Sequence, residues 1–376
     1  MKQEIISYIS SIKEDIYNLS NYLYTNPEPN YNEYKGYSYI VNMLKTNNFE
    51  VQENYCNIPT SFYAQYGSGH PKICYICKYS STDNLGHLFG NNVNASISVA
   101  AALGLSKVIS KSGGSVILLG CPGDYVNGSE LTLTKEKCFD DMDVIISTHC
   151  DITNAESGSS MATIPIKIKY NQNNNLNNLS SLDVYLFILN ALSQLLKGFK
   201  NGCCIDAISM NNITSCLNSF SKSEVKFYIR ATNIIEAELL ERTIVDFIKS
   251  TSTIMNITYD ISRFELPSQE LLSNKCLSRI FTHNLKESGI INIACCKNTL
   301  YGLGIGSISH ITPCIYPSIC ITENPLISCP SPLFALETQT DFCKDNMIKA
   351  AEALAITGLD LIEKQDLLKE IRFELK

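Results

Sequence analysis

A histidine and three carboxylates are the side chains of this sequence best suited to acid–base or metal chemistry: His149, Asp83, Asp124 and Asp151. Imidazole and carboxylate groups bind divalent metal ions, and a mononuclear centre built from these four residues is one arrangement that the sequence leaves open. His149 follows the apolar run 144–148, which is typical of a strand. Because α/β sheets bind ligands at the carboxyl ends of their strands, we expect His149 either to contact a ligand or to form a plain hydrogen bond there.

Arg230 ends another apolar run, 225–230. Its guanidinium group can bind a ligand carboxylate through two nitrogens or pair with a neighbouring acid, and the ion pair is the commoner arrangement. We keep Arg230 as a candidate ligand-binding residue at a strand end.

Sixteen cysteines are spread through the chain. Cys74 and Cys77 have CxxC spacing, but they lie in the apolar run 73–79, and no second pair follows at zinc-finger spacing. We therefore expect buried, reduced thiols. Cys121 and Cys150 lie near the other candidates in the sequence, but a cysteine nucleophile needs a base beside its thiol, which the sequence does not show.

Composition limits the protein class. The 376 residues are 45% hydrophobic and 18% charged, which is typical of a globular protein with two domains. No apolar run approaches the length of a membrane span. A net charge of -7 argues against nucleic acid or an anionic membrane as partner, since both require a basic surface. The first residues lack the apolar core of a secretion signal, so we expect a cytoplasmic protein.

The order of elements predicts an α/β domain with a parallel-rich sheet covered by helices. Helices are expected at 4–23, 37–44 and 95–108, and strands at 61–66, 73–79, 116–119 and 144–147. The same pattern resumes after residue 267, with helices at 270–287 and 341–362 and strands around Ile291 and Ile319.

Between these two parts the pattern changes to that of a small α+β sandwich. Strands are expected at 164–170, 225–230 and 257–261, helices at 181–196 and 234–249, and a solvated polar loop at 171–178. We therefore expect an α/β domain formed by 1–162 and 267–376, interrupted by an inserted α+β domain at 163–266.

Segments along nearly the whole chain resemble those of the M20 metallo-amidohydrolases, in particular the aminoacylase-like and dipeptidase branch. They lie at 26–33, 86–92, 120–125, 143–149, 230–231, 306–317 and 353–357. The resemblance implies a zinc-peptidase-like catalytic-type domain with an inserted lid or dimerisation domain. It also implies a homodimer formed through the inserted domain, and a ligand that is an N-acyl-amino acid or dipeptide-like molecule.

The resemblance further implies which positions would bind the family's two zinc or manganese ions. They are occupied here by Phe89, Asn91, Tyr125, His149 and Tyr316. Phenylalanine cannot coordinate a metal, and a neutral amide is a poor ligand where imidazole, thiolate or carboxylate is wanted. One histidine cannot hold a dinuclear site, so we expect no bound metal and no other cofactor.

The same alignment of segments places Asp124 where the family has its general base, one methylene shorter than the usual glutamate. Base catalysis depends on reach to the attacking water, so this is a weak catalytic candidate. Lys78-Tyr79-Ser80 stands where the family has Glu-Tyr-Asp. We expect Lys78 either to replace part of the lost metal charge or to be solvated at a strand end. The loop at 170–173 lacks the histidine and glycine with which the family stabilises an oxyanion.

These substitutions predict a pseudoenzyme or ligand-binding homo-oligomer. Its expected ligand-binding residues are His149, Arg230, Asn91, Tyr125, Tyr316 and Lys78. The alternative is an active metal-independent or mononuclear enzyme that hydrolyses or forms an amide bond, with Asp124 as base and His149 as its orienting partner. A third hypothesis is a structural subunit that pairs with an active homologue.

Overall fold

The structure, a computed structural model, describes residues 1–123, 128–171, 181–199, 202–211, 223–255 and 257–375. The chain forms two compact units. The first comprises Met1–Ser159, Leu272–Asn298 and Ser307–Lys376, and the second comprises Ser160–Leu271 and Thr299–Gly306. The expected inserted domain at 163–266 did not include 299–306. This segment joins the second unit because Met161 N donates to Tyr301 O at 3.2 Å, and Gly302 lies so close to Thr163 that a Cβ would clash.

The first unit is built on a six-stranded sheet with the order β1-β2-β4-β3-β5-β11. The strands are β1 (Glu50–Glu53), β2 (Phe62–Gly67), β3 (Lys72–Cys77), β4 (Ser115–Gly120), β5 (Val144–Ile146) and β11 (Cys314–Ile315). Strands β4, β3, β5 and β11 run parallel, while β2 pairs antiparallel with both β1 and β4. The parallel strands are continuous apolar runs, as expected for strands covered on both faces. The predicted parallel-rich α/β fold is confirmed.

Helix α4 (Asn91–Ser112) is the central helix of this unit. It packs against β2, β3 and β4 and is covered in turn by α1 (Lys2–Ser11), α2 (Lys13–Thr25) and α11 (Asp341–Glu363). Small and apolar residues of α4 occupy all faces of the helix, as in helices buried in a core. Within the described residues it is long and apolar enough to cross a membrane, so the expectation that no such run exists was wrong. However, 89% of its apolar 18-residue window is buried inside the protein.

Several expected boundaries also needed correction. The helix expected at 4–23 is interrupted at Ile12, where φ is -102° and ψ is 7°. The helix expected from residue 270 begins later, as α8 (Lys275–Glu287), because the Asn274 side chain caps it by accepting from Leu277 N at 2.8 Å. The strand expected around Ile291 is absent from that described segment. The strand expected around Ile319 is β12 (Ser318–Cys320), which pairs in parallel with β6 (His149–Asp151).

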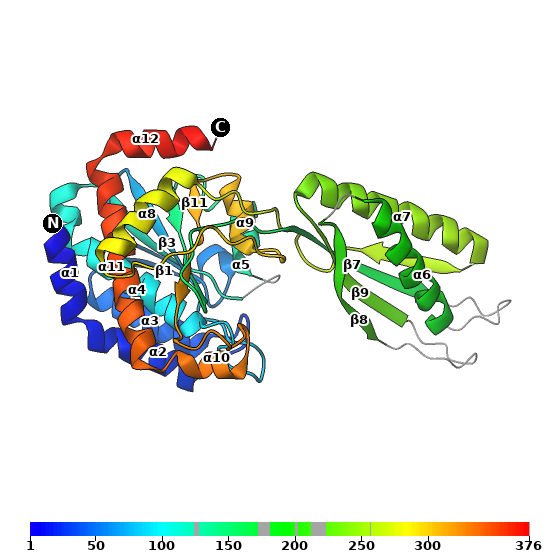
Figure 1. Ribbon diagram of the computed structural model, residues 1–376, viewed down its shortest axis with the longest axis horizontal. Coiled ribbons are helices and arrows are strands. Elements are labelled where there is room, and N and C mark those ends of the chain that lie inside the picture. Colours follow the sequence, from blue (N-terminus) through cyan, green and yellow to red (C-terminus); the bar gives the residue numbers. More distant parts are fainter. Residues whose placement is uncertain (124–127, 172–180, 200–201, 212–222, 256, 376) are drawn as a thin grey trace. The chain divides into compact units, whose positions relative to one another are not determined.

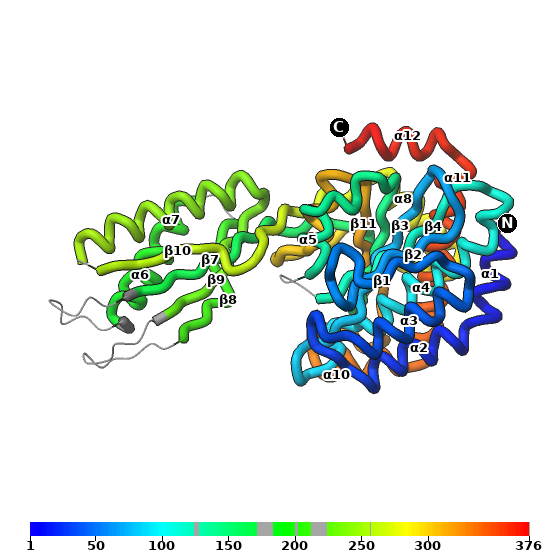
Figure 2. The backbone as a smooth tube through the Cα atoms, turned by 180° about the vertical axis from the view of Figure 1, so that it is seen from behind, coloured from blue at the N-terminus to red at the C-terminus, as the bar shows by residue number. Residues whose placement is uncertain are grey.

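The second unit is an antiparallel sheet with the order β10-β7-β9-β8. Its strands are β7 (Ala162–Asn171), β8 (Cys204–Asn211), β9 (Ser223–Ala231) and β10 (Thr258–Ser262), and α6 (Ser181–Leu195) and α7 (Ile234–Met255) lie on one face (Figure 1, Figure 2). The sequence missed β8 because most of this edge strand is exposed and lacks an apolar pattern. The loop predicted at 171–178 lies, beyond Asn171, outside the described residues.

Short helices complete the fold: α3 (Tyr34–Thr46), α5 (Ser129–Lys135), α9 (Gly304–Ser309), α10 (Pro332–Glu337) and α12 (Gln365–Glu374). Helix α12 ends the chain beside α8 and α11 (Figure 1). The Glu374 carboxylate accepts from Lys275 N at 2.9 Å and from Cys276 N at 3.0 Å. The last helix therefore caps the first turn of α8.

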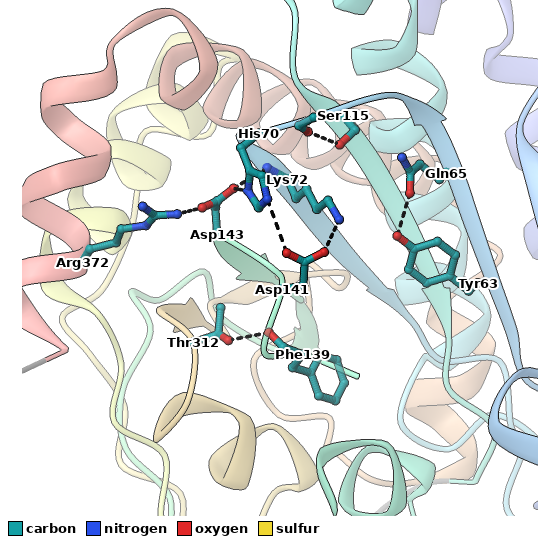
Figure 3. A network of polar contacts seen from close by, with 11 residues as sticks. Tyr63, Gln65, His70, Lys72, Ser115, Phe139, Asp141, Asp143, Thr312 and Arg372 are labelled. Atoms are coloured by element: carbon teal, nitrogen blue, oxygen red, sulfur yellow. Dashed lines mark hydrogen bonds and ion pairs between the residues drawn. The ribbon is translucent and has the colours of Figure 1, made fainter. Parts of the chain in front are cut away.

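A polar network fastens the starts of strands β3 and β5 (Figure 3). Asp143, just before β5, is buried and accepts from Lys72 N at 2.6 Å. His70 Nδ1 lies 2.6 Å from the same carboxylate, and Arg372 of α12 forms an ion pair with it. The exposed Asp141 pairs with Lys72. The network joins two neighbouring strands to the C-terminal helix.

Candidate functional site

The candidate site lies at the carboxyl ends of the parallel strands. Lys78 follows β3, Cys121 follows β4 and Tyr316 follows β11, while His149 begins β6 just after β5. His149 N donates to Pro317 O at 3.0 Å, which holds the two chain segments side by side. Neighbouring strands therefore deliver these side chains to one edge of the sheet, where α/β proteins bind ligands.

Three predicted site residues meet at this edge. The rings of His149 and Tyr316 stack with centroids 5.6 Å apart and planes inclined by 24°. Lys78 Nζ lies 6.0 Å from the centroid of the Tyr316 ring, within the range of a cation–π contact. The site thus combines an imidazole, a phenol and an ammonium group.

Lys78 forms an enclosed ion pair with Glu130 of α5. The Nζ–Oε1 distance is 2.5 Å, and the two side chains are 6% and 0% exposed. Both expectations for Lys78 therefore need correction. It is not solvated, and since Glu130 neutralises its charge, it does not supply a free positive charge in place of a metal. Glu130 escaped the sequence analysis because an acid in the first turn of a short helix is ordinarily exposed.

Asn91 is placed by the tight start of α4. Gly90, in the left-handed region at φ 71°, lies so close to Cys150 that a Cβ would come within 2.8 Å of the cysteine Cβ. Only glycine fits this approach without strain, and it brings the start of α4 next to the strand of His149. Asn91 Nδ2 donates to Ser80 O at 3.0 Å, so the amide is held by the chain that follows Lys78.

Glu33 is a buried group that sequence reasoning did not single out. Its carboxylate accepts from Ser80 Oγ at 2.5 Å, Thr60 Oγ1 at 2.9 Å and Gly123 N at 2.9 Å. Gly123 directly precedes Asp124 in the sequence. Glu33 therefore fixes the start of the segment that carries the expected base. Three converging donors explain how a carboxylate can be fully buried.

The other predicted residues are Asp124, Tyr125 and Arg230. Asp124 and Tyr125 lie outside the described residues. Arg230, in the second unit, donates from Nε to Asp206 Oδ2 at 2.7 Å and from Nη1 to Thr163 Oγ1 at 3.3 Å. Arg230 therefore has an acidic partner, the arrangement that the sequence analysis gave as the commoner one. The surroundings of Arg230 are described only within the second unit.

Two of the three carboxylates that could have rebuilt a metal centre are described, and each is engaged elsewhere or exposed. Asp151 Oδ2 accepts from Lys297 Nζ at 2.8 Å, and Asp83 is exposed on the loop before α4. Within the described part of the chain, no group of three or more His, Cys, Asp or Glu side chains is placed to bind a metal. Asp83, Asp151 and His149 therefore do not form such a centre among themselves.

The cysteines near the site are unreactive by environment. Burial, reinforced by the neighbouring Glu130 carboxylate, raises the pKa of Cys121 well above its ordinary value. Burial likewise raises the pKa of Cys150, whose thiol lies 3.2 Å from Asn94 Oδ1. Both thiols are protonated at neutral pH, which argues against either as a nucleophile.

A cavity of about 1230 Å³ lies elsewhere on the first unit, between residues 24–32, the loop 81–87 and α10. Asp83 is the candidate carboxylate that lines it, and the rings of His149 and Tyr316 are not among its lining residues. His87 also lines it, and this side chain is buried and held by a 3.0 Å contact of Nε2 with Leu23 O.

Comparisons with known proteins agree with this architecture. No family model matches the chain. The Xaa-Arg dipeptidase of Mus musculus is 25% identical over 100% of this chain and 92% of its own length. One of the subunits of p-aminobenzoyl-glutamate hydrolase from Escherichia coli is 25% identical over 39% of this chain and 35% of its own length.

Solved structures share the fold. A putative aminohydrolase from methicillin-resistant Staphylococcus aureus has a TM-score of 0.77 and 15% identity, covering 96% of this chain and 100% of its own. A dinuclear-metal-binding peptidase of the M20 family from Bacillus subtilis has a TM-score of 0.67 and 12% identity, covering 93% of this chain and 99% of its own. In sequence along its whole length and in fold, this chain is a homologue of the M20 amidohydrolases and dipeptidases.

Proposed function

We propose that this M20 homologue has lost the dinuclear metal centre and acts as a non-hydrolytic protein that binds a small, amino-acid-like or N-acylated ligand. The observation that carries the proposal is the stacking of Tyr316 on His149. Among the positions where the resemblance expects metal ligands, His149 supplies the one imidazole. Tyr316 occupies another of these positions and places a phenol ring beside that imidazole.

The side chains present do not fit a pair of zinc or manganese ions. Phe89 has no donor atom, and the Asn91 amide is bound through its nitrogen to Ser80 O. A neutral phenol at Tyr316 is a poor ligand, and His149 by itself offers one nitrogen. The nearby carboxylate, Glu130, is already paired with the Lys78 ammonium group. These side chains therefore offer no site for two catalytic metal ions.

The chemistry of the edge supports an amino-acid-like ligand. The stacked rings of His149 and Tyr316 present a flat surface, and Lys78 Nζ lies 6.0 Å from the centroid of the Tyr316 ring. Two relatives carry names that refer to amide-linked amino acids, a dipeptide ending in arginine and p-aminobenzoyl-glutamate. The flat or acyl part of such a ligand would suit the stacked rings, whereas the enclosed Lys78–Glu130 pair offers it no free charge.

The metal content of the purified protein tests the central part of the proposal. Protein purified without chelator, and again after soaking in zinc and in manganese, should contain less than roughly a tenth of an equivalent of metal by mass spectrometry. A matched variant restores ligands at the four substituted positions: Phe89→Cys, Asn91→His, Tyr125→Glu and Tyr316→His. It should bind clearly more metal than the wild type. One or two tightly held equivalents in the wild type would refute the proposal.

An activity assay separates this proposal from its enzymatic alternative. The metal-free protein should not hydrolyse or form amides of N-acyl-amino acids or dipeptides. If a product accumulates and the Asp124→Asn or His149→Ala variant abolishes it, the protein is a metal-independent amidohydrolase instead. Absence of turnover together with ligand binding in calorimetry supports the non-hydrolytic function.

We also propose that the protein is a homodimer formed through the second unit. Support comes from exposed apolar side chains on its two helices: Leu186 and Phe187 on α6, and Ile235 and Leu239 on α7. Light scattering should give twice the chain mass of 41.8 kDa. Leu239→Glu should shift the protein to the monomer. A monomeric wild type, or a heteromer purified with an active homologue, would contradict this assembly.

A further inference from the structure

Two cysteines far apart in the sequence face each other on the first unit. The Sγ atoms of Cys56 and Cys138 are 3.0 Å apart, although 82 positions separate the residues. This is inside the roughly 3.5–4.0 Å at which non-bonded heavy atoms pack, and it leaves about 1 Å to close before a disulfide bond forms. Both residues are half-buried, so small molecules in solution can reach the pair.

Local backbone turns present the two thiols. Cys56 lies in the left-handed region at φ 53°, between Asn54 at 52° and Asn57 at 61°. This conformation is unfavourable for cysteine, and the surrounding contacts must hold it. Lys137, just before Cys138, is also left-handed at φ 61°. Both cysteines lie at turns rather than inside a strand or a long helix, so closing the last distance breaks no sheet pairing.

The segments on either side are anchored. Tyr55 N donates to Ser61 O at 3.1 Å, which closes the turn between β1 and β2. Cys138 N donates to Leu133 O at 3.0 Å at the end of α5. The sulfur atoms are therefore positioned by backbone hydrogen bonds rather than by free rotation of a loop.

We propose that Cys56 and Cys138 form a reversible disulfide, a redox modification site that ties α5 to the connection between β1 and β2. The proposal is independent of the function proposed above. Its structural consequence concerns α5, which carries Glu130 in its first turn and ends three residues before Cys138, at Lys135. The bond would restrain the helix that supplies the partner of Lys78.

The oxidation requires a low-molecular-weight disulfide such as oxidised glutathione. The Cys56 thiolate attacks one sulfur of the reagent, and one glutathione leaves as thiolate. Cys138 then gives up its proton and attacks the Cys56 sulfur of the mixed disulfide, releasing the second glutathione. Two protein thiols are oxidised, one reagent disulfide is reduced, and the two protons pass to the two glutathione thiolates.

The order of attack follows from the environment. Burial, together with the contact from Cys56, raises the pKa of Cys138 to about 12. Cys138 is therefore protonated at neutral pH and is suited to the second, intramolecular step, where proximity compensates for a low thiolate fraction.

Peptide mapping of the full chain tests the bond. The protein is equilibrated with oxidised and reduced glutathione at several ratios, free thiols are alkylated, and digests are analysed without reduction. A linked peptide containing Cys56 and Cys138 should appear as the ratio becomes oxidising and disappear with excess reduced glutathione. The Cys56→Ser and Cys138→Ser variants should each lack it, while Cys295→Ser, at an exposed cysteine, should retain it.

Hydrogen exchange tests the effect on α5. In the oxidised wild type, peptides covering 129–139 should exchange about threefold or more slowly than in the reduced protein, and in Cys56→Ser the oxidant should change nothing. No linked peptide at any ratio would refute the bond. Glutathione adducts on both cysteines without a link would refute it equally. A link that leaves exchange of α5 unchanged would refute the restraint on the helix.

Discussion

In the six-stranded sheet, the carboxyl ends of the parallel strands form what we call the carboxyl edge, and their amino ends form the opposite edge. Each edge has a buried carboxylate that is paired with one or more cations, and the exposure of these cations differs. At the carboxyl edge, Glu130 and Lys78 are both enclosed, with side chains 0% and 6% exposed. At the opposite edge, Asp143 is equally buried, but its partners His70 and Arg372 are about half exposed (Figure 3).

The difference shows where the protein depends on exact pairing. An enclosed ion pair has lost the hydration of both charges, and each partner needs the other. A half-exposed cation can instead recover water when its carboxylate is removed. We therefore expect the removal of a single charge at the carboxyl edge to cost much stability. At the opposite edge, the removal of Asp143 should cost mainly the hydrogen bond that its carboxylate accepts from Lys72 N.

The largest effect is expected for Lys78→Met. It leaves Glu130 buried without its cation, which should cost about 3–5 kcal/mol in the free energy of unfolding of the first unit. The double variant Lys78→Met/Glu130→Leu should recover most of this loss, because no charge is left unpaired. Urea unfolding followed by circular dichroism measures both. A single variant as stable as the wild type would remove the distinction between the edges.

A smaller effect is expected at the opposite edge. Asp143→Ala removes the acceptor of Lys72 N and two ion-pair contacts, and should cost about 2 kcal/mol, since His70 and Arg372 can be rehydrated. The control Asp141→Ala removes a carboxylate that is 67% exposed and should change stability by less than about 0.5 kcal/mol. Equal losses in the two variants would show that burial of Asp143 does not matter.

The capping of α8 by the last helix offers a finer comparison at the same end of the molecule. Glu374→Ala removes the acceptor of two backbone N–H groups and should cost about 1 kcal/mol, or about 2–3 °C in melting temperature. Lys369→Ala, at an exposed position on the same helix, should not shift the melting temperature measurably. A melting temperature for Glu374→Ala unchanged from the wild type would show that water replaces the cap at no cost.

A pH-dependent effect of similar size is expected for a carboxylate on α11. Burial, and then the nearby Asp345, raises the pKa of Glu352 to about 7 from an ordinary 4.5. Between these two pH values the folded state binds more protons than the unfolded state, so stability falls as pH rises through this range. Glu352→Gln should therefore stabilise by about 1 kcal/mol at pH 8, a value reduced for partial exposure, and by nothing near pH 4.

Melting temperatures of Glu352→Gln and wild type across pH 4–8 measure this effect. The exposed Glu363→Gln, at the end of the same helix, is the control variant. A constant difference between Glu352→Gln and wild type at every pH would mean that lost packing, and not titration, is responsible.

Much of the fold could be predicted because local patterns reflect burial. The strands that became β3, β4 and β5 are continuous apolar runs, and α4 and α11 are rich in alanine and other small apolar residues. Prediction failed where the pattern is weak. β8 is mostly exposed, and β6 and β11 have only three and two residues, too short to show a period.

The candidate site was only partly predictable. His149 was recognised at a strand end and Tyr316 through the family resemblance, and the structure stacks their rings. Glu33 and Glu130 were not, since each carries out its role through partners distant in sequence: Glu33 binds Gly123, and Glu130 binds Lys78. Such pairs depend on which strands become neighbours.

The residue types and their order along the chain establish the α/β class and the chemical limits of the site. Phe89 has no donor atom and Tyr316 no imidazole wherever the chain places them, because coordinating ability belongs to the side chain. Only the tertiary structure decided that Lys78 is neutralised by Glu130 and that Cys56 faces Cys138. Local periodicity reports which face of an element is buried, whereas contacts between distant residues are fixed only when the sheet order and the turns between strands bring them together.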